Sequence, residues 1–301
     1  HEGAVFCGGV KMNYIFTVAA LFSLVTSVSA AGQTQLKRGE YLFNIAGCKS
    51  CHTDTKNKGK LLAGGTPLKT PFGTFYGLNI TKDKAFGIGK FTDEDFIRAL
   101  REGITPNGQH YFPAFPFTSF TKMTDQDMRD IKAYIFSLPA VAQPNKPNEI
   151  AFPFSIRLLQ IGWKLLFFKK GVFKPNKEKS KEWNRGAYLV QALAHCSECH
   201  TPRNILGGSD TSKFLAGTPD GPGGDLAPNI TPDPETGIGK WPATEIADVI
   251  NFGMLPDGDF VGSSMADVSE NLAKLTPQDL AAIVVYLQSL PPIRHKVSSK
   301  K

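Results

Sequence analysis

The chain has 301 residues, five cysteines and a formal net charge of +7. Its length suits two domains of ordinary size. A moderately basic surface fits transient docking on an acidic protein partner. The sequence has no basic or aromatic recognition motif for nucleic acid, which argues against a nucleic-acid-binding protein.

Residues 1–30 have the pattern of upstream sequence followed by a secretory signal peptide. Lys11 precedes an apolar run over residues 14–25, and small residues at 28–30 stand where a signal peptidase cleaves. The run is shorter than the ~20 apolar residues of a membrane-spanning helix. We therefore predict cleavage after Ala30 and a periplasmic mature protein, either free or associated with the outer face of the inner membrane.

One five-residue motif occurs twice, as Cys48-Lys49-Ser50-Cys51-His52 and as Cys196-Ser197-Glu198-Cys199-His200. A Cys-x-x-Cys-His motif is the attachment signature of a c-type haem, whose vinyl groups form thioethers with the thiols while the histidine binds iron. A zinc site built from two Cys-x-x-Cys pairs would leave both histidines unexplained. The sequence therefore predicts two covalently bound haem c groups, attached to Cys48, Cys51, Cys196 and Cys199, with His52 and His200 as iron ligands.

The sequence around the motifs is also repeated. Residues 38–42 recur at 185–189, and Asn79-Ile80-Thr81 recurs as Asn229-Ile230-Thr231. The repeat predicts a tandem duplication, with cytochrome c-like domains at 31–139 and 184–301 joined by a linker at 140–183. Because the Asn-Ile-Thr triplets occupy equivalent points of both copies, we interpret them as structural and not as glycosylation sites.

Each copy is predicted to be all-α, with three helices around its haem. In the first copy we expect helices over 36–46, over 92–102 and from Thr124; in the second, over 181–193, up to Gly253 and from Thr276. Thr92 and Asp95 form a capping box, and Gly103 is a stop signal. A domain of ~100 residues has a small core of its own, so each haem is expected to complete one.

The ligand opposite each histidine decides whether a haem carries electrons or does chemistry. Met265 follows a glycine- and serine-containing loop and is the expected ligand of the second haem. At the constant offset of 150 residues its counterpart is Phe115, which cannot bind iron. Three alternatives remain for the first haem: His110, Met123, or an open or water-bound iron.

The linker has no counterpart in the repeat. Its polar start leads into an apolar stretch over residues 150–168, which Arg157 and Lys164 interrupt. These charges argue against a membrane-spanning helix. We expect an amphipathic helix buried between the two haem domains. The alternative is a helix that docks on a membrane surface or on a partner, through aromatic residues with cations beside them.

With these motifs, the chain resembles the di- and tri-haem cytochrome c subunits of membrane-bound alcohol and gluconate dehydrogenases. The resemblance rests on both haem motifs, both Asn-Ile-Thr to Gly-Ile-Gly blocks and the loop before Met265. It implies electron transfer from a quinone-type or flavin dehydrogenase to quinone or a terminal oxidase. It departs from the family at Phe115, where the family pattern is Pro-x-Met-Pro, and it does not extend to a third haem domain or a C-terminal membrane anchor.

We therefore expect an exported dihaem cytochrome that passes electrons from a periplasmic or membrane-bound dehydrogenase to a downstream cytochrome or oxidase. The haem would supply the redox chemistry, and the protein its ligands, burial and access. The alternative is a haem enzyme whose open or weakly ligated first haem acts on peroxide or a sulfur oxyanion.

Overall fold

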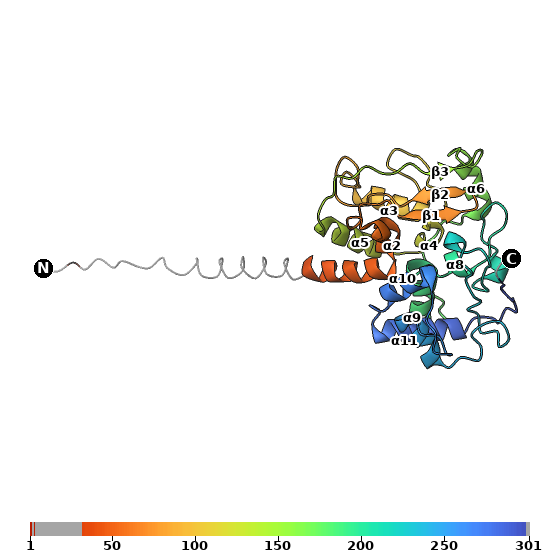
Figure 1. The fold of residues 1–301 in the computed structure, drawn as a ribbon. Coiled ribbons are helices and arrows are strands. Elements are labelled where there is room, and N and C mark those ends of the chain that lie inside the picture. The colour runs from red at the N-terminus through yellow and green to blue at the C-terminus, as the bar shows by residue number, and fades with distance from the viewer. Residues whose placement is uncertain (2, 4–31, 299–301) are drawn as a thin grey trace.

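The computed structural model of the protein describes residues 1, 3 and 32–298. The predicted signal peptide therefore lies outside the described residues, as does the sequence upstream of it apart from positions 1 and 3. The described part is mostly helical (Figure 1), which confirms the predicted helical class. None of its helices is both long and apolar enough to cross a membrane.

The first helix covers residues 32–45. The helices after it are α2 (Cys48–His52), α3 (Asp93–Glu102), α4 (Phe117–Phe120), α5 (Asp125–Ser137), α6 (Leu159–Phe167), α7 (Lys181–Tyr188), α8 (Ser197–His200), α9 (Ala243–Phe252), α10 (Ser263–Leu272) and α11 (Pro277–Gln288). Shorter turns are the 3-10 helices η1 (Thr55–Asn57), η3 (Thr211–Lys213) and η4 (Pro222–Gly224) and the π-helical η2 (Leu189–Leu193).

A small antiparallel sheet, which the sequence analysis did not predict, adds three strands in the order β1-β2-β3. The strands are β1 (Pro67–Thr70), β2 (Gly73–Tyr76) and β3 (Glu149–Ile150). A Cβ atom at Gly73 would lie 2.1 Å from the carbonyl oxygen of Glu149, so only glycine allows β2 and β3 to approach this closely.

Helix boundaries follow the predicted capping signals. Thr92 forms a capping box with Asp95 at the start of α3, and Gly103 ends this helix with a φ of 62°. Thr124 and Thr276 each accept a hydrogen bond from the backbone N–H three residues later, at the starts of α5 and α11. These local signals are satisfied within one helical turn, so they do not depend on the tertiary fold.

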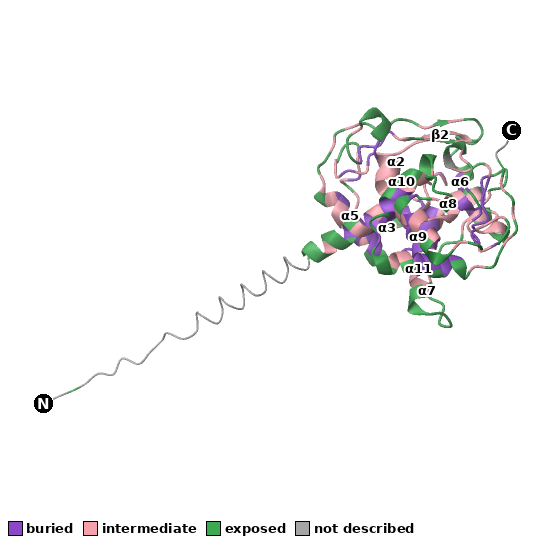
Figure 2. Cartoon of the chain, turned by 60° about the horizontal axis from the view of Figure 1, so that its bottom comes forward, coloured by how far each residue is buried: buried purple, intermediate pink, exposed green. Residues whose placement is uncertain are grey.

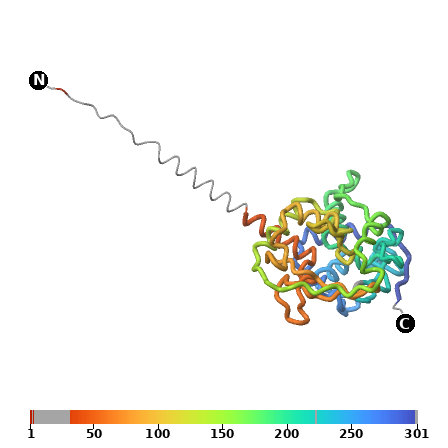
Figure 3. The backbone as a smooth tube through the Cα atoms, turned by 90° about the horizontal axis from the view of Figure 1, so that it is seen from above, coloured from red at the N-terminus to blue at the C-terminus, as the bar shows by residue number. Residues whose placement is uncertain are grey.

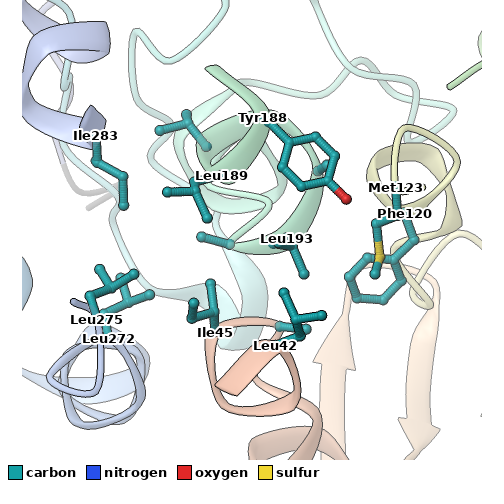
Figure 4. Packing of buried hydrophobic residues seen from close by; sticks show 14 of the residues in the cluster. Leu42, Ile45, Phe120, Met123, Tyr188, Leu189, Leu193, Leu272, Leu275 and Ile283 are labelled. Atoms are coloured by element: carbon teal, nitrogen blue, oxygen red, sulfur yellow. The ribbon is translucent and has the colours of Figure 1, made fainter. Parts of the chain in front are cut away.

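Two halves of the chain meet around one core. In Figure 1 the sheet, α3 and α5 lie above α9, α10 and α11, and Figure 2 shows buried residues gathered in the interior of the body. Figure 4 shows Leu42 and Ile45 of the first helix pointing toward Leu193 of η2. All three are at most 3% exposed and belong to one continuous apolar cluster. The halves therefore share a core instead of each enclosing its own.

Reciprocal hydrogen bonds join the halves at the edges of this core. Tyr41 of the first helix donates to Asp279 at the start of α11, at 2.6 Å, and accepts from the backbone N–H of Thr276. Tyr188 of α7 donates in turn to Asp127 at the start of α5. Each half thus gives a tyrosine hydroxyl to a carboxylate of the other, as in a two-fold interface.

The expectation that the linker helix is buried between two domains is wrong. Its helix, α6, lies at the edge of the molecule beside the sheet (Figure 1), and Leu165 and Leu166 are 83% and 71% exposed. The buried side chains of α6 are instead the polar Gln160 and Lys164. Past α6, the green connection that leads into α7 projects from the body (Figure 3).

The hydrogen bonds of Lys164 explain this orientation. Its Nζ donates to the backbone carbonyl oxygens of Glu102 at 2.6 Å and Gly103 at 2.8 Å, at the C-terminal end of α3. A cation there satisfies carbonyl groups that the helix leaves without partners. The polar side of α6 therefore faces the body, which leaves its leucines facing outward.

The Tyr41→Phe variant should unfold more easily than the wild-type protein. It removes a hydrogen bond to a charged acceptor and the acceptor for the backbone N–H of Thr276, so we expect the free energy of unfolding to fall by about 1–2 kcal/mol. Denaturant unfolding of the haem-loaded protein measures this. The matched control is Tyr134→Phe, because the Tyr134 hydroxyl makes a single 3.4 Å contact with Glu40. Equal effects of the two substitutions would contradict a special role for Tyr41.

Candidate functional site

His52 ends α2, and its ring is fixed by one hydrogen bond. Nδ1 lies 2.6 Å from the carbonyl oxygen of Leu78. Because a carbonyl only accepts, Nδ1 carries the proton and Nε2 keeps a lone pair. Burial also lowers the pKa of His52, which favours the neutral ring that binds a metal. The side chain is therefore oriented and protonated as an iron ligand requires.

His200 at the end of α8 has the same environment in the second half. Its Nδ1 lies 2.8 Å from the carbonyl oxygen of Pro228, and burial lowers its pKa. Leu78 and Pro228 stand at the same point of the sequence repeat, just before the two Asn-Ile-Thr triplets. The two sites therefore position their histidines in the same way.

The four cysteines of the two motifs form no disulfide bond among the described residues, so their sulfur atoms are available for thioethers. In each motif they lie three residues apart within one helical turn, so both sulfurs lie on the same side of it. Before a haem is attached, burial raises the pKa of Cys48 and of Cys196 to about 12, which favours the neutral thiol. Within residues 32–298 no three His, Cys, Asp or Glu side chains form a group that could hold a metal ion, so a zinc site lacks its ligand set. Neutral thiols beside an oriented imidazole fit covalent haem.

A left-handed glycine supports the backbone of each histidine. The N–H of Gly64 donates to the carbonyl oxygen of His52 at 2.8 Å, and that of Gly217 donates to His200 at 2.7 Å. Their φ angles are 80° and 84°. A Cβ atom at Gly64 would also lie 2.5 Å from the carbonyl oxygen of Gly77. The turn after each motif therefore needs glycine for both conformation and space.

The two Asn-Ile-Thr triplets have the structural role that the sequence predicted. The Oδ1 atom of Asn79 accepts hydrogen bonds from the backbone N–H and the hydroxyl of Thr81, and its Nδ2 donates to the carbonyl of Val141 at 2.8 Å. Asn229 makes the same two contacts with Thr231. Because both asparagines are buried, they are closed to glycosylation.

Each motif is also held by the opposite half of the chain. Asn271 of α10 donates to the Ser50 hydroxyl at 2.8 Å, and Glu198 accepts from the hydroxyls of Thr118 and Ser119 at 2.7 and 2.6 Å. Ser50 and Glu198 occupy the same position in their motifs. The contacts are therefore reciprocal, and they bring the two motifs toward each other.

The predicted ligand Met265 lies in the first turn of α10 and not in a loop. The hydroxyls of Ser263 and Ser264 both donate to Asp225, which fixes the start of the helix. Met265 itself is partly exposed. At the corresponding point of the first half, the Phe115 ring centre lies 5.9 Å from that of Phe120. A packed aromatic ring therefore stands where the second half has a thioether.

The other two candidates lie in different environments. Met123 is fully buried in the shared core beside Phe120 (Figure 4), which favours a packing role. The Nδ1 atom of His110 is buried and has no hydrogen-bond partner among the described residues. Burial, then the positive charges of Lys164 and Arg98, lowers the pKa of His110, so its ring is neutral.

Comparison with known proteins agrees with these features. Residues 36–139 match the Cytochrome c family model. A dihaem c-type cytochrome of Cereibacter sphaeroides is 42% identical over 87% of this chain and 88% of its own length. The chain therefore belongs to the dihaem c-type cytochromes, and it carries two covalently bound haem c groups.

Two further relatives are subunits of dehydrogenases. The fructose dehydrogenase cytochrome subunit of Gluconobacter japonicus is 38% identical over 87% of this chain, and the gluconate 2-dehydrogenase cytochrome c subunit of Pantoea cypripedii is 35% identical over 86%. The chain spans 54% and 60% of those relatives' lengths. These similarities support electron transfer as the general role.

Sequence reasoning missed the residues that orient the motifs. Gly64 and Gly217 stand at matching points of the repeat, and both follow their motif by a short loop. A comparison of the two copies at this level could have found them. In contrast, the contacts of Ser50 and Glu198 are made with the opposite half of the chain, and no local sequence pattern predicts them.

The Gly64→Ala variant should lose haem at the first motif. The new Cβ atom collides with the Gly77 carbonyl, which moves the backbone that holds His52. The measurement is the haem content per chain, which should fall toward half. The matched control is Gly108→Ala, because Gly108 has a φ of 81° but nothing within 4 Å of an added Cβ atom. If both variants keep two haems, the proposed support of His52 is wrong.

Proposed function

We propose that this chain is an exported dihaem cytochrome that passes electrons from a dehydrogenase to a downstream cytochrome or oxidase. The observation that carries the proposal is the matched setting of His52 and His200, each with Nδ1 on a carbonyl and Nε2 free. Two such sites in one rigid body suit the relay of electrons better than the binding of a substrate between them. The dehydrogenase relatives support a dehydrogenase as the donor.

We assign each half of the chain its own haem site. Residues 31–139 and 184–301 are duplicated cytochrome c domains, and 140–183 links them. The thiols form the thioethers to haem, and the two histidines bind iron. Met265 would bind the iron of the second haem together with His200, and a His/Met pair would raise the reduction potential. The residues of these assignments are Cys48, Cys51, His52, Cys196, Cys199, His200 and Met265.

Contacts of each motif with the opposite half support electron transfer within the chain. Asn271 holds Ser50 of the first motif, while Thr118 and Ser119 hold Glu198 of the second. The third residue of each motif, Ser50 or Glu198, is therefore in contact with the other half. The protein contributes a fixed separation between the two sites, and the haems supply the redox chemistry when bound.

The proposed location is the periplasm. Thioether-linked haem is assembled outside the bacterial cytoplasm, and the predicted signal peptide agrees with export. The formal charge of +7 suits brief docking on acidic redox partners, because charge mainly raises the rate of association.

Reduction by a dehydrogenase tests this function. Ferric haem-loaded protein, mixed with the catalytic subunits of a gluconate, fructose or alcohol dehydrogenase and the matching substrate, should become ferrous, as followed by haem absorbance. Met265→Ala should lose the long-wavelength charge-transfer band of the ferric protein and lower the potential of one haem. Met254→Ala is the control and should keep both properties.

Two results would count against these assignments. If none of the three dehydrogenases reduces the wild-type protein, the donor class is wrong. If Met265→Ala keeps the charge-transfer band, the methionine ligand lies elsewhere.

A second candidate function rests on Phe115. Its ring packs against Tyr111 and Phe120, with ring centres 5.4 and 5.9 Å away, in the place that corresponds to Met265. A phenyl ring cannot bind iron, so the first haem would be open or weakly ligated unless His110 binds it. An open haem could bind a small molecule such as peroxide or a sulfur oxyanion and convert it, which would make the protein a haem enzyme.

The Phe115→Met variant distinguishes the two candidates. A thioether at this position should bind the first iron, strengthen the charge-transfer band and reduce the binding of carbon monoxide by the ferrous protein. His110→Ala should leave the wild-type spectrum unchanged if the first iron is open. A wild-type protein that binds no carbon monoxide, with a spectrum that changes in His110→Ala, would identify His110 as the ligand and exclude an open site.

A further inference from the structure

The linker exposes an apolar surface that the electron-transfer role does not use. Four of its side chains are more than two-thirds exposed, and we call them the bridge surface: Phe152 (81%), Leu158 (72%), Leu165 (83%) and Leu166 (71%). They lie on or just before α6, at the edge of the body. Exposed apolar residues concentrated in one segment indicate a contact with another apolar phase.

The bridge surface faces outward because the opposite side of α6 is bound to the body of the protein. Lys164 donates to the carbonyls at the end of α3, and Trp163 Nε1 donates to the carbonyl of Leu206 at 2.9 Å. Phe167 fills the space beside Gly208, where an added Cβ atom would lie 2.3 Å from its ring. Three neighbouring side chains of α6 therefore fix it to the body, with Leu165 and Leu166 on the free side.

Charge identifies what the bridge surface meets. Residues 150–177 contain no Asp or Glu, and their basic residues are Arg157, Lys164, Lys169, Lys170, Lys174 and Lys177. Lys169 and Lys174 are exposed beyond the end of α6. Apolar side chains flanked by cations are complementary to a bilayer with anionic headgroups, where the leucines enter the acyl boundary and the lysines stay at the phosphates.

We propose that the bridge surface binds an anionic lipid bilayer, with α6 lying in the plane of the headgroups. The contact is interfacial, because no helix of the described residues is long enough to span the membrane. A protein partner is the less suitable occupant, since protein interfaces carry many polar groups and a surface of leucine and phenylalanine side chains offers few hydrogen bonds. Membrane binding does not rest on the proposed electron transfer and goes beyond it.

Vesicle sedimentation tests the proposal. The full haem-loaded protein should co-sediment with phosphatidylglycerol-containing vesicles and remain in solution with pure phosphatidylcholine vesicles. The double variant Leu165→Gln/Leu166→Gln should lose at least about tenfold in partitioning, because two apolar side chains no longer enter the bilayer. The matched control is Phe252→Gln, which changes an apolar residue that is 63% exposed at the end of α9; it should bind as wild type does.

A second pair of substitutions tests the electrostatic part. Lys169→Gln/Lys174→Gln should weaken binding by about fivefold per lysine and reduce its salt dependence. Absence of wild-type binding to anionic vesicles, or equal binding by the leucine double variant, overturns the proposal. A dimer that only the wild-type protein forms, without vesicle binding, assigns the surface to self-association instead. Reduction of the variants in solution by a dehydrogenase should be unchanged, which separates this test from that of the electron-transfer role.

Discussion

Two carboxylates that each serve both halves of the chain hold this protein together. Asp127 is almost completely buried and accepts from Arg38 of its own half and from Tyr188 of the other. Asp279 does the same with Arg185 and Tyr41. A buried charge is tolerated only when it is fully paired. Because each carboxylate accepts from both halves, separating the halves would remove one donor from Asp127 and one from Asp279.

The reciprocal interface also explains why each haem motif lies against the opposite half of the chain. The first helix and α7 carry the tyrosines. The first helix is followed closely by the first Cys-x-x-Cys-His motif, and α7 continues through η2 to the second. Because each tyrosine is hydrogen-bonded to the opposite half, the motif that comes after it in the chain is drawn toward that half. Ser50 and Glu198 then lie against the opposite half. The core and its polar edge therefore contribute to the arrangement of the two sites.

Local features of this fold were predictable, and long-range ones were not. The caps at Thr92 and Gly103 are decided within one turn, so the sequence is sufficient for them. The sheet depends on Gly73 meeting a strand far along the chain. For α6 the sequence pattern indicated two faces but not which faces inward, because a buried lysine is rare and is stabilised here by the end of α3. The positions of the two haem motifs could be predicted without knowledge of any long-range contact.

The candidate site shows the same division. Residue spacing was enough to predict the haem groups, and the register of the repeat was enough to expose the difference between Phe115 and Met265. Spacing could not reveal that Leu78 and Pro228 fix the ring nitrogens of the two histidines. The start of α10, where Asp225 accepts hydrogen bonds from Ser263 and Ser264, could not be predicted either. Asp225 lies outside the blocks of sequence that match between the two copies. These hydrogen bonds depend on loops that fold back onto the motifs and onto α10, and residue spacing does not predict such loops.

The separation of the contact partners along the chain has a consequence for maturation. Glu198 is held by residues 79 and 80 positions earlier, whereas Ser50 waits for Asn271, 221 positions later. If the chain is exported from its N-terminus, as proposed, the partners of Glu198 would precede the second motif. The hydrogen bond between Ser50 and Asn271 would form only after almost the whole chain has crossed. The cross-half contact of the first motif would therefore be completed later than that of the second.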